Sequence, residues 1–301
     1  MVGYLFPGQG TVRVGMGAWL RRNPVARNVL DAFDERLSRP ISPICTRGPL
    51  DRLVSTEHAQ IAVTACNLAT HAVLADEGYE PHVVAGHSVG ELSALYAAGV
   101  LDLAEVARLV ELRARLMAQI DVVGGMHAIM GLEVAQVEEM AMWATAPDEP
   151  LVVGLENAPG HVVVSGHIGA LDRLAKLATS ASKIVELAVG NAFHSPLMEP
   201  AVPAWTEAVE AALMTPPRVP VVPNVTAEPT LDLVAIRRAL IAQLTGRVLW
   251  TRTVAVVDAM GPSVEVGDSK VLAGLSRRSG ARCLSMAEPG TLRRLAREVA
   301  A

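Results

Sequence analysis

The sequence predicts an α/β protein: a large unit built on a parallel sheet, with a small βαββαβ unit inserted in it. Short valine-rich runs alternate with stretches of helical periodicity along most of the chain. Between Gly124 and Gly190 this rhythm changes, and two neighbouring apolar runs are joined across a Pro-Gly turn. A short apolar run that leads through a glycine-bounded turn into an amphipathic stretch is typical of a buried parallel strand covered by helices.

The large unit opens with the run GYLF, which is expected to be a strand. Helical periodicity then predicts helices over about 15–37 and 60–77, followed by a strand at 82–85. After residue 190 the same alternation returns. It predicts helices over about 201–213, 233–244 and 251–260, strands at 219–222 and 263–266, and two further helices after them.

The inserted unit is expected over residues 125–190, which leaves 1–124 and 191–301 for the large unit. Pro159-Gly160 marks a tight turn, so the apolar runs on either side of it are expected to form a hairpin. The apolar runs lie at 127–132, 151–155, 161–165 and 183–189, and the helical stretches at 134–144 and 168–180. This order, β-α-β-β-α-β, is the ferredoxin-like arrangement.

Composition narrows the class of protein. With 301 residues, 51% of them hydrophobic, the chain is expected to be globular and to bury one large core. Its 26 basic and 31 acidic residues are spread along the chain and lack the basic stripe that nucleic acid binding requires. Cys45, Cys66 and Cys283 are widely spaced and are expected to be reduced thiols. No signal-peptide pattern or bilayer-length apolar run occurs, which predicts a cytoplasmic protein without membrane contact.

The strongest local signal is VVAGHSVGELSAL, in which Ser88 lies within G-x-S-x-G between a predicted strand and a predicted helix. This context predicts the nucleophile elbow of α/β-hydrolase-like sheets, where Gly86 and Gly90 remove side chains that would collide. The following helix favours negative charge beside Ser88, and the amide of Val89 is expected to be one oxyanion donor. The alternative is that Ser88 only caps a helix in a glycine-rich turn.

A serine hydroxyl needs a base within hydrogen-bond reach, and the chain has eight histidines. His194 is the candidate base, because GNAFHSPLME forms a loop at the junction of the two units, where a rigid scaffold presents catalytic groups. The alternative is a structural histidine. His87 adjoins Ser88 and is expected to pack beside it. The histidines of the small unit are expected to be structural or exposed: His127, His161 and His167.

Two further polar residues are candidate parts of the site. The glycines of FPGQG would bring the main-chain amide of Gln9 close to the nucleophile as the second oxyanion donor, unless this segment is an ordinary tight turn. Arg113 lies in LVELRARLM among apolar residues that should face the core, so it needs a carboxylate partner. A substrate carboxylate would serve, and Glu91 is the alternative partner. Arg115 is expected to face solvent.

Five segments, in this order and at these separations, resemble the acyl-carrier-protein S-malonyltransferase family, which includes the acyltransferase domains of polyketide and fatty acid synthases. They are FPGQG, GHSVGE, LVELRARLM, AFHSPLM and EVG near residue 265. The resemblance extends from residue 4 to about residue 278. The chain departs from the family pattern at Asp268 and Ser269, where proline and glycine usually follow EVG, and at His161, where glutamine is common. We expect the turn at Asp268 to alter the entrance of the site.

The resemblance assigns a role to each candidate residue. Ser88 would carry the acyl group, with His194 as its base. The amides of Gln9 and Val89 would form the oxyanion hole, and Arg113 would bind the free carboxylate of a malonyl-type substrate.

Two finer assignments also come from the resemblance. In the family a main-chain carbonyl orients the histidine, and the matching stretch RVLW indicates Leu249 as its donor. NAFH resembles the form associated with malonyl selection, in which Phe193 narrows the space beside the acyl α-carbon.

The implied reaction moves a malonyl or related group from coenzyme A to the phosphopantetheine thiol of an acyl carrier protein, through an acyl-serine. Malonyl-CoA is the expected donor, and no bound metal or redox cofactor is needed. One alternative is a transferase or editing hydrolase for bulkier carrier-bound acyl groups, against which Arg113 argues. The other is a non-catalytic carrier-docking module, which the intact Ser88 and His194 disfavour.

Overall fold

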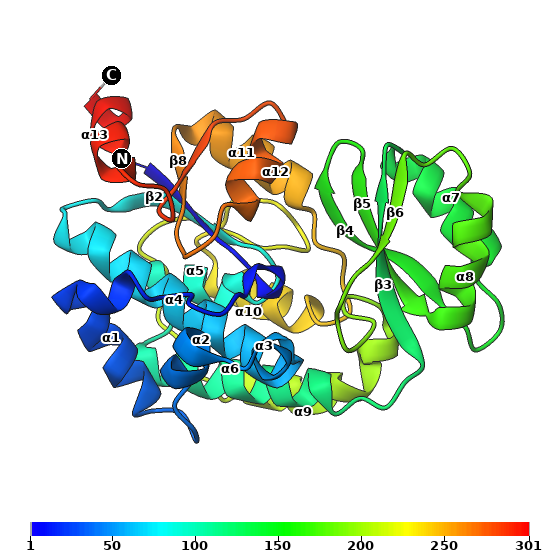
Figure 1. Ribbon diagram of the computed structural model, residues 1–301, viewed down its shortest axis with the longest axis horizontal. Helices are drawn as coiled ribbons and strands as arrows, with labels where there is room; N and C mark the ends of the chain where they lie inside the picture. Colours follow the sequence, from blue (N-terminus) through cyan, green and yellow to red (C-terminus); the bar gives the residue numbers. More distant parts are fainter. Residues whose placement is uncertain (1, 301) are drawn as a thin grey trace.

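The computed structural model describes residues 2–300, which form a large and a small α/β unit side by side (Figure 1). Over these residues the large unit contains a five-stranded parallel sheet in the order β7-β2-β1-β8-β9. Its strands are β1 (Val2–Phe6), β2 (Pro81–Gly86), β7 (Val221–Val222), β8 (Ser263–Glu265) and β9 (Cys283–Ser285). β1 is buried along its whole length, as expected for the central strand of a parallel sheet.

Helices cover both faces of this sheet. Successive side chains of a strand point to opposite faces, so Gly3 and Tyr4 of β1 meet different helices. Tyr4 packs edge-on against His71 of α4 (Thr56–Asp76), with the ring centroids 6.0 Å apart. On the other face a Cβ on Gly3 would lie only 2.7 Å from Cγ1 of Val257 in α11 (Trp250–Met260). The glycine in the first strand therefore lets α11 approach the sheet closely.

The remaining helices of the large unit surround α4, α11 and the sheet. They are α1 (Pro24–Asp34), α2 (Ser42–Arg47), α3 (Leu50–Val54), α5 (Gly90–Ala97), α6 (Leu103–Ala118), α9 (Val202–Glu210), α10 (Leu233–Ala242), α12 (Val271–Arg278) and α13 (Thr291–Ala300), with short 3-10 turns at Gln9–Thr11, Leu20–Arg22 and Pro196–Ala201. None of the helices in residues 2–300 combines the length and the apolar character that crossing a bilayer requires.

The expected helix over 15–37 is correct only in its second half. Gly15 and Gly17 adopt positive φ angles of 89° and 75°, which a helix does not allow. The helix α1 begins at Pro24, after the side chain of Asn23 has accepted hydrogen bonds from the first free amides. The segment before Asn23 is therefore a series of turns.

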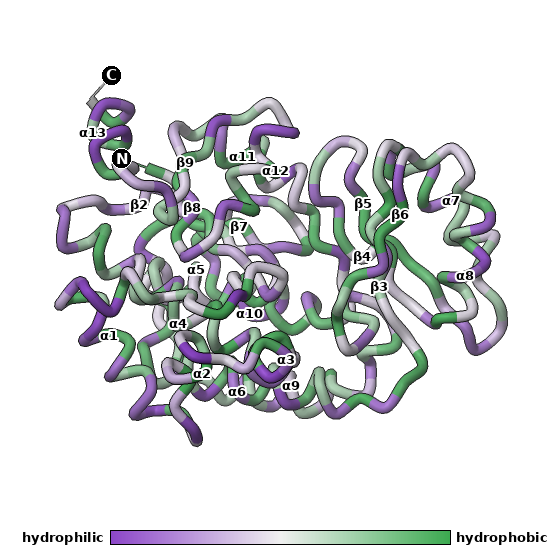
Figure 2. The backbone as a smooth tube through the Cα atoms, in the orientation of Figure 1, coloured by the Kyte–Doolittle hydropathy of each residue, from purple (hydrophilic) through white to green (hydrophobic). Residues whose placement is uncertain are grey.

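The small unit contains a four-stranded antiparallel sheet within the described residues, in the order β4-β5-β3-β6. Its elements follow the expected order: β3 (Gly124–Met130), α7 (Val134–Ala144), β4 (Leu151–Ala158), β5 (His161–His167), α8 (Ile168–Leu177) and β6 (Lys183–Glu186). β4 and β5 form the hairpin predicted across NAPG. In Figure 2 these two strands carry mostly apolar residues, whereas α13 is largely hydrophilic.

A bulge in β4 turns part of this strand toward the large unit. Val153 pairs with Val164 and Leu155 pairs with Val163, so Gly154 is an extra residue in its strand. The bulge turns Leu155 away from the small unit's own core and into the core shared with the large unit. A Cβ on Gly154 would lie 3.3 Å from the main-chain oxygen of His194, so the glycine leaves space for that loop.

The combination of a large parallel α/β unit and a ferredoxin-like insert is confirmed. The exact boundaries, residues 1–124 and 191–301 for one unit and 125–190 for the other, stay a prediction.

Candidate active site

Ser88 lies on a sharp turn between β2 and α5. Its φ angle is +53°, in the left-handed region that residues other than glycine occupy at an energetic cost. Both neighbouring glycines are required. A Cβ on Gly86 would lie 2.0 Å from the carbonyl carbon of Gly90, and a Cβ on Gly90 would lie 2.2 Å from the carbonyl oxygen of Phe6. The side-chain oxygen of Asn224 holds the turn by accepting a hydrogen bond from the amide of Ser88 at 2.7 Å.

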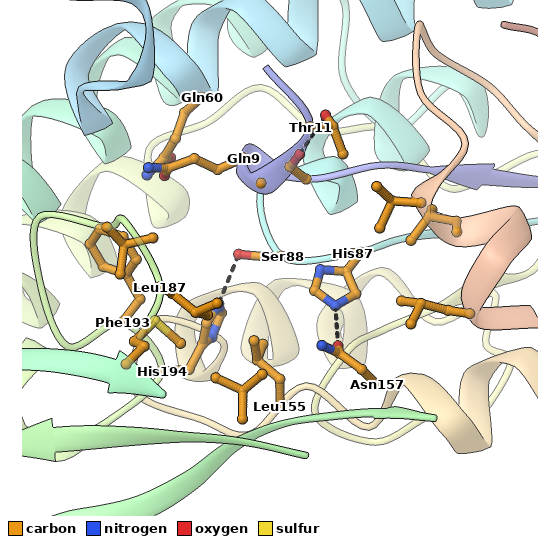
Figure 3. Close-up of a pocket in the computed structure, with 18 of the residues that line it drawn as sticks. Gln9, Thr11, Gln60, His87, Ser88, Leu155, Asn157, Leu187, Phe193 and His194 are labelled. Carbon is orange, nitrogen blue, oxygen red and sulfur yellow. Dashed lines mark hydrogen bonds between the residues drawn. The ribbon is translucent and has the colours of Figure 1, made fainter. Parts of the chain in front are cut away.

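The hydroxyl of Ser88 points at His194, as Figure 3 shows, and Oγ lies 2.7 Å from Nε2. The other ring nitrogen, Nδ1, faces the carbonyl oxygens of Gln243 at 2.9 Å and Gly246 at 3.1 Å. Carbonyl oxygens only accept, so Nδ1 carries the proton and Nε2 is free to accept one from the serine. The fold therefore brings the predicted nucleophile and base together, although they lie 106 residues apart in sequence.

The assignment of Leu249 as the residue that orients His194 is wrong. The carbonyl oxygen of Leu249 accepts hydrogen bonds from the amide (3.0 Å) and hydroxyl (3.1 Å) of Thr253 in the first turn of α11. The orienting carbonyls come instead from Gln243 and Gly246, just beyond the end of α10. Helix ends leave main-chain carbonyls without partners, which is why this position can serve the imidazole.

Arg113 is almost fully buried, with 1% of its surface exposed, and its guanidinium lies beside Ser88. Nη1 donates to the side-chain oxygen of Gln60 at 2.6 Å, and Nη2 donates to that of Gln243 at 2.9 Å. Nη2 is also 3.3 Å from Oγ of Ser88. Burial lowers the pKa of Arg113 to about 10, while the charge of Glu91 acts in the opposite direction, so the guanidinium is positively charged at neutral pH.

Glu91, the alternative partner of Arg113, makes no ion pair with it. Its carboxylate accepts from the amide of Asn224 at 3.0 Å and from Nε2 of Gln243 at 2.8 Å. Across residues 2–300 no acidic group lies within ion-pair distance of Arg113, so its charge has no carboxylate in direct contact.

The amides of Gln9 and Val89 are free for a ligand: neither donates to a protein acceptor in the described part of the chain. The turn that carries Gln9 needs its first glycine, because a Cβ on Gly8 would lie 2.5 Å from the carbonyl oxygen of His87. Val89 directly precedes α5, so its amide belongs to the positive end of that helix. The two amides remain candidate oxyanion donors.

A cavity of about 280 Å³ opens onto Ser88, and both units contribute to its walls. The polar part holds Arg113 together with Gln9, Gln60 and His194, and Figure 3 labels the last three. The apolar part is formed by Met117, Met126, Leu155, Val163, Leu187, Val189, Phe193, Val271, Leu272 and Leu275. Phe193 is 6% exposed, and its role in selecting the acyl group stays a prediction.

Burial sets the proton affinities of two groups around the serine. Burial, together with the positive charge of Arg113, lowers the pKa of His194 to about 3, although the hydrogen bonds to the two carbonyls act in the opposite direction. The imidazole is therefore neutral at pH 7 and able to act as a base. Burial raises the pKa of Glu91 to about 7, while hydrogen bonds from Gln243 and Asn224 and the charge of Arg113 lower it.

Sequence reasoning missed Gln243, which connects every part of the site. Its side-chain oxygen accepts from Arg113, its amide nitrogen donates to Glu91 and to the carbonyl oxygen of Ser88, and its own carbonyl faces His194. It is 1% exposed at the end of α10, in the run IAQLTG. A polar residue in an apolar helical stretch is the same signal that singled out Arg113, and it applied equally here.

The other histidines have varied positions. His87 donates from Nε2 to the side-chain oxygen of Asn157 (2.8 Å) and packs edge-on against Trp250, which agrees with its expected packing role. His167 caps α8 by accepting from Gly169. His161, expected to be structural or exposed, lies in the cavity wall.

A parallel α/β sheet with a strained serine elbow, combined with a small antiparallel unit and with the loop after that unit that brings His194 to the serine, is typical of an acyl-transferring class of α/β protein. The chain belongs to the acyl transferase family, since the family model described as acyl transferase domain matches residues 3–265.

Several relatives agree with this assignment. The chain is 37% identical over 285 residues to a malonyl CoA-acyl carrier protein transacylase of Salmonella typhimurium, with 91% of each chain covered. It matches the crystal structure of an acyl-carrier-protein-S-malonyltransferase from Bartonella henselae with a TM-score of 0.94, 34% identity and 100% coverage of both chains. A third relative, with a TM-score of 0.92, 31% identity and 97% coverage of both chains, is a malonyl-transacylase in complex with a type II PKS acyl-carrier protein.

Proposed function

We propose that this protein transfers a malonyl group from coenzyme A to the phosphopantetheine thiol of an acyl carrier protein, through an acyl-serine at Ser88. The observation that carries the proposal is the buried guanidinium of Arg113, which lies 3.3 Å from Oγ of Ser88 and has no carboxylate of the described residues within ion-pair distance. In malonyl thioesters one methylene separates the carboxylate from the reacting carbonyl. When Arg113 holds the carboxylate, this short spacer would place the reacting carbonyl next to Ser88. A longer spacer would place the carbonyl too far from Oγ.

In the first half-reaction Ser88 takes the malonyl group from coenzyme A. Nε2 of His194 accepts the hydroxyl proton while Oγ attacks the thioester carbonyl carbon. The electron pair of the C=O bond moves to its oxygen, which the amides of Gln9 and Val89 stabilise. When this pair returns, the C–S bond breaks, and His194 gives its proton to the departing sulfur. The products are malonyl-Ser88 and free coenzyme A.

In the second half-reaction the thiol of the carrier's phosphopantetheine attacks malonyl-Ser88 by the same steps. Thioester is exchanged for thioester, so the reaction is nearly isoenergetic and water is the competitor that matters. The apolar wall formed by residues such as Leu155, Val163 and Leu187 supports the transfer, because it favours the pantetheine arm over water. The names of the Salmonella and PKS relatives support the donor and the carrier.

A transferase or hydrolase for bulkier acyl groups is the weaker assignment. Phe193 and Met117 limit the cavity beside Arg113, and a bulky neutral acyl group would leave the guanidinium buried without an anion.

The test uses purified protein and four donors: malonyl-, methylmalonyl-, succinyl- and acetyl-CoA. Intact-mass analysis is expected to show a malonyl adduct on the parent and none on Ser88→Ala. Added holo-acyl carrier protein should remove the malonyl group from Ser88 and increase in mass by that group. The apo form should do neither. The absence of a malonyl adduct, or an adduct that water removes faster than the holo-carrier does, would refute the proposal.

A further inference from the structure

The carboxylate of Asp268 is buried, and its hydrogen-bond partners come from one distant segment, residues 13–19. Its side chain is 2% exposed. Oδ1 accepts from Nη2 of Arg13 at 2.8 Å and from Nε1 of Trp19 at 3.1 Å, and Oδ2 accepts from the amide of Gly17 at 2.8 Å. Nη1 of Arg13 also donates to the main-chain oxygen of Asp268 at 2.6 Å. A buried carboxylate with three donors, one of which is a guanidinium that forms an ion pair with it, fixes both segments in one geometry.

Segment 13–19 needs such a fixed point because it contains neither helix nor strand. Its main chain turns through Gly15 and Gly17, both at positive φ angles. The amide of Gly15 is tied to the carbonyl oxygen of Cys45 at 2.8 Å, on the side of α2. Asp268 supplies the tie on the side of the sheet, where the catalytic cavity lies.

The two segments joined by this contact both continue into the wall of that cavity. Four residues before Arg13, the turn with Gln9 and Thr11 forms part of the cavity wall. On the other side Asp268 lies three residues before the start of α12, and Val271, Leu272 and Leu275 of α12 form another part of the same wall. The contact therefore connects the candidate oxyanion turn to the helix at the cavity.

We propose that Asp268, through Arg13 and the amide of Gly17, is a positioning residue that fixes the amide of Gln9 and the first turn of α12 relative to Ser88. The inference rests on the proposed function, since that function makes Gln9 an oxyanion donor.

The expected effect follows from the narrow geometry of an oxyanion hole. A donor must lie within hydrogen-bond distance of the oxyanion, and a misplacement of about 1 Å can lower a rate about 10²-fold. Arg13 is 53% exposed, so its replacement opens no cavity in the core, while Asp268 keeps the hydrogen bonds from Trp19 and the amide of Gly17. Arg13→Met is therefore expected to lower kcat for malonyl loading about 10-fold or more, with a smaller change in KM, because the oxyanion forms only in the transition state.

Two readouts test the proposal on Arg13→Met, Arg13→Lys, Asp268→Asn and Trp19→Phe. The first is malonyl loading from malonyl-CoA. The second is the rate at which a fluorophosphonate probe modifies Ser88, because the phosphoryl oxygen of the probe occupies the oxyanion position and no acyl-CoA is involved. Both rates should fall together in Arg13→Met. Arg13→Lys should recover part of the loss, and Arg13→Met combined with Asp268→Asn should be no slower than Asp268→Asn alone.

Arg173→Met is the matched control. Arg173 is 40% exposed in the small unit, where it also joins a carboxylate, that of Glu149 (2.6 Å), to a main-chain oxygen, that of Ala144 (2.7 Å). It lies outside the catalytic cavity wall, and its loss should change neither rate.

The outcomes separate the two proposals. Folded Arg13→Met and Asp268→Asn proteins that react with the probe at the parental rate would overturn the role of Asp268. A parent that reacts with the probe but accepts no malonyl would refute the proposed substrate, and the probe rates of the variants would still decide the role of Asp268. A parent that does not react with the probe would overturn both.

Discussion

Replacing Arg113 by alanine should separate malonyl from acetyl as donors. In the parent the guanidinium is held by Gln60 and Gln243 and faces Ser88. Without it, a malonyl carboxylate would enter a buried site and find no cation. Removal of one partner of a buried ion pair costs about 3–5 kcal/mol, which corresponds to a fall of roughly 10²- to 10⁴-fold in kcat/KM for malonyl-CoA. An acetyl group never needed that partner, so its rate should be kept or should rise.

The assay is the rate of acyl-serine formation with malonyl-CoA and acetyl-CoA, measured by rapid quench and intact mass. The ratio of the two rates is the decisive quantity, because any disturbance of Ser88 or Gln243 by the substitution affects both donors. Arg113→Lys should restore malonyl loading only in part, since an ammonium group lacks the planar pair of donors that grips a carboxylate. Equal losses for the two donors would show that Arg113 is structural and would remove the main support for the malonyl assignment.

Three further predictions concern the groups around the serine. His194→Ala should load malonyl roughly 10²- to 10⁴-fold more slowly than the parent, the usual worth of a general base, and loading at the parental rate would place the base elsewhere. The kcat/KM of the parent should show no decline near pH 6.5 from His194, because burial and Arg113 lower its pKa to about 3; an inflection near 6.5 that Glu91→Gln retains would contradict this. Burial raises the pKa of Glu91 from 4.5 to about 7, so the folded protein binds the extra proton between these values and loses stability as pH rises through them. At 1.36 kcal/mol per unit of pKa, the free energy of unfolding should fall by roughly 3 kcal/mol. Urea unfolding at pH 5 and pH 8 should show this fall in the parent but not in Glu91→Gln. If the two proteins differed in free energy of unfolding by the same amount at both pH values, the prediction would be wrong.

The parts of the fold with strong periodicity could be predicted from the sequence. The helix α7 has the predicted bounds, and the hairpin followed from Pro159-Gly160, because these signals are local. The strand β9 (Cys283–Ser285) was missed, since three residues carry too little alternation to be recognised and its pairing with β8 is made only in the folded chain. The start of α1 was misplaced because helical periodicity continued through Gly15 and Gly17, where the main chain cannot be helical.

The same distinction applies to the site. Ser88 and Arg113 can be identified from the local sequence. Ser88 has glycines on both sides, and Arg113 is a charged residue among apolar ones. The carbonyls that orient His194 have no such signal, because every residue has a main-chain carbonyl. Which carbonyls can accept from His194 depends on where α10 ends in the folded chain. Asn224 lies in a loop, where asparagine is common, so its contact with the amide of Ser88 could not be anticipated.

The buried charges of the site explain why one arginine can serve both selectivity and catalysis. The charge of Arg113 adds to burial in lowering the pKa of His194, so the imidazole is a weak base. In the proposed reaction a malonyl carboxylate on Arg113 neutralises that charge and raises the pKa of His194, which strengthens the base when the correct donor is present. A neutral acyl group leaves the charge uncompensated and the base weak. Discrimination between donors then acts on proton transfer as well as on binding. Gln243 contacts Arg113 through its side chain and His194 through its main chain. It therefore keeps the two groups at the separation on which this coupling depends.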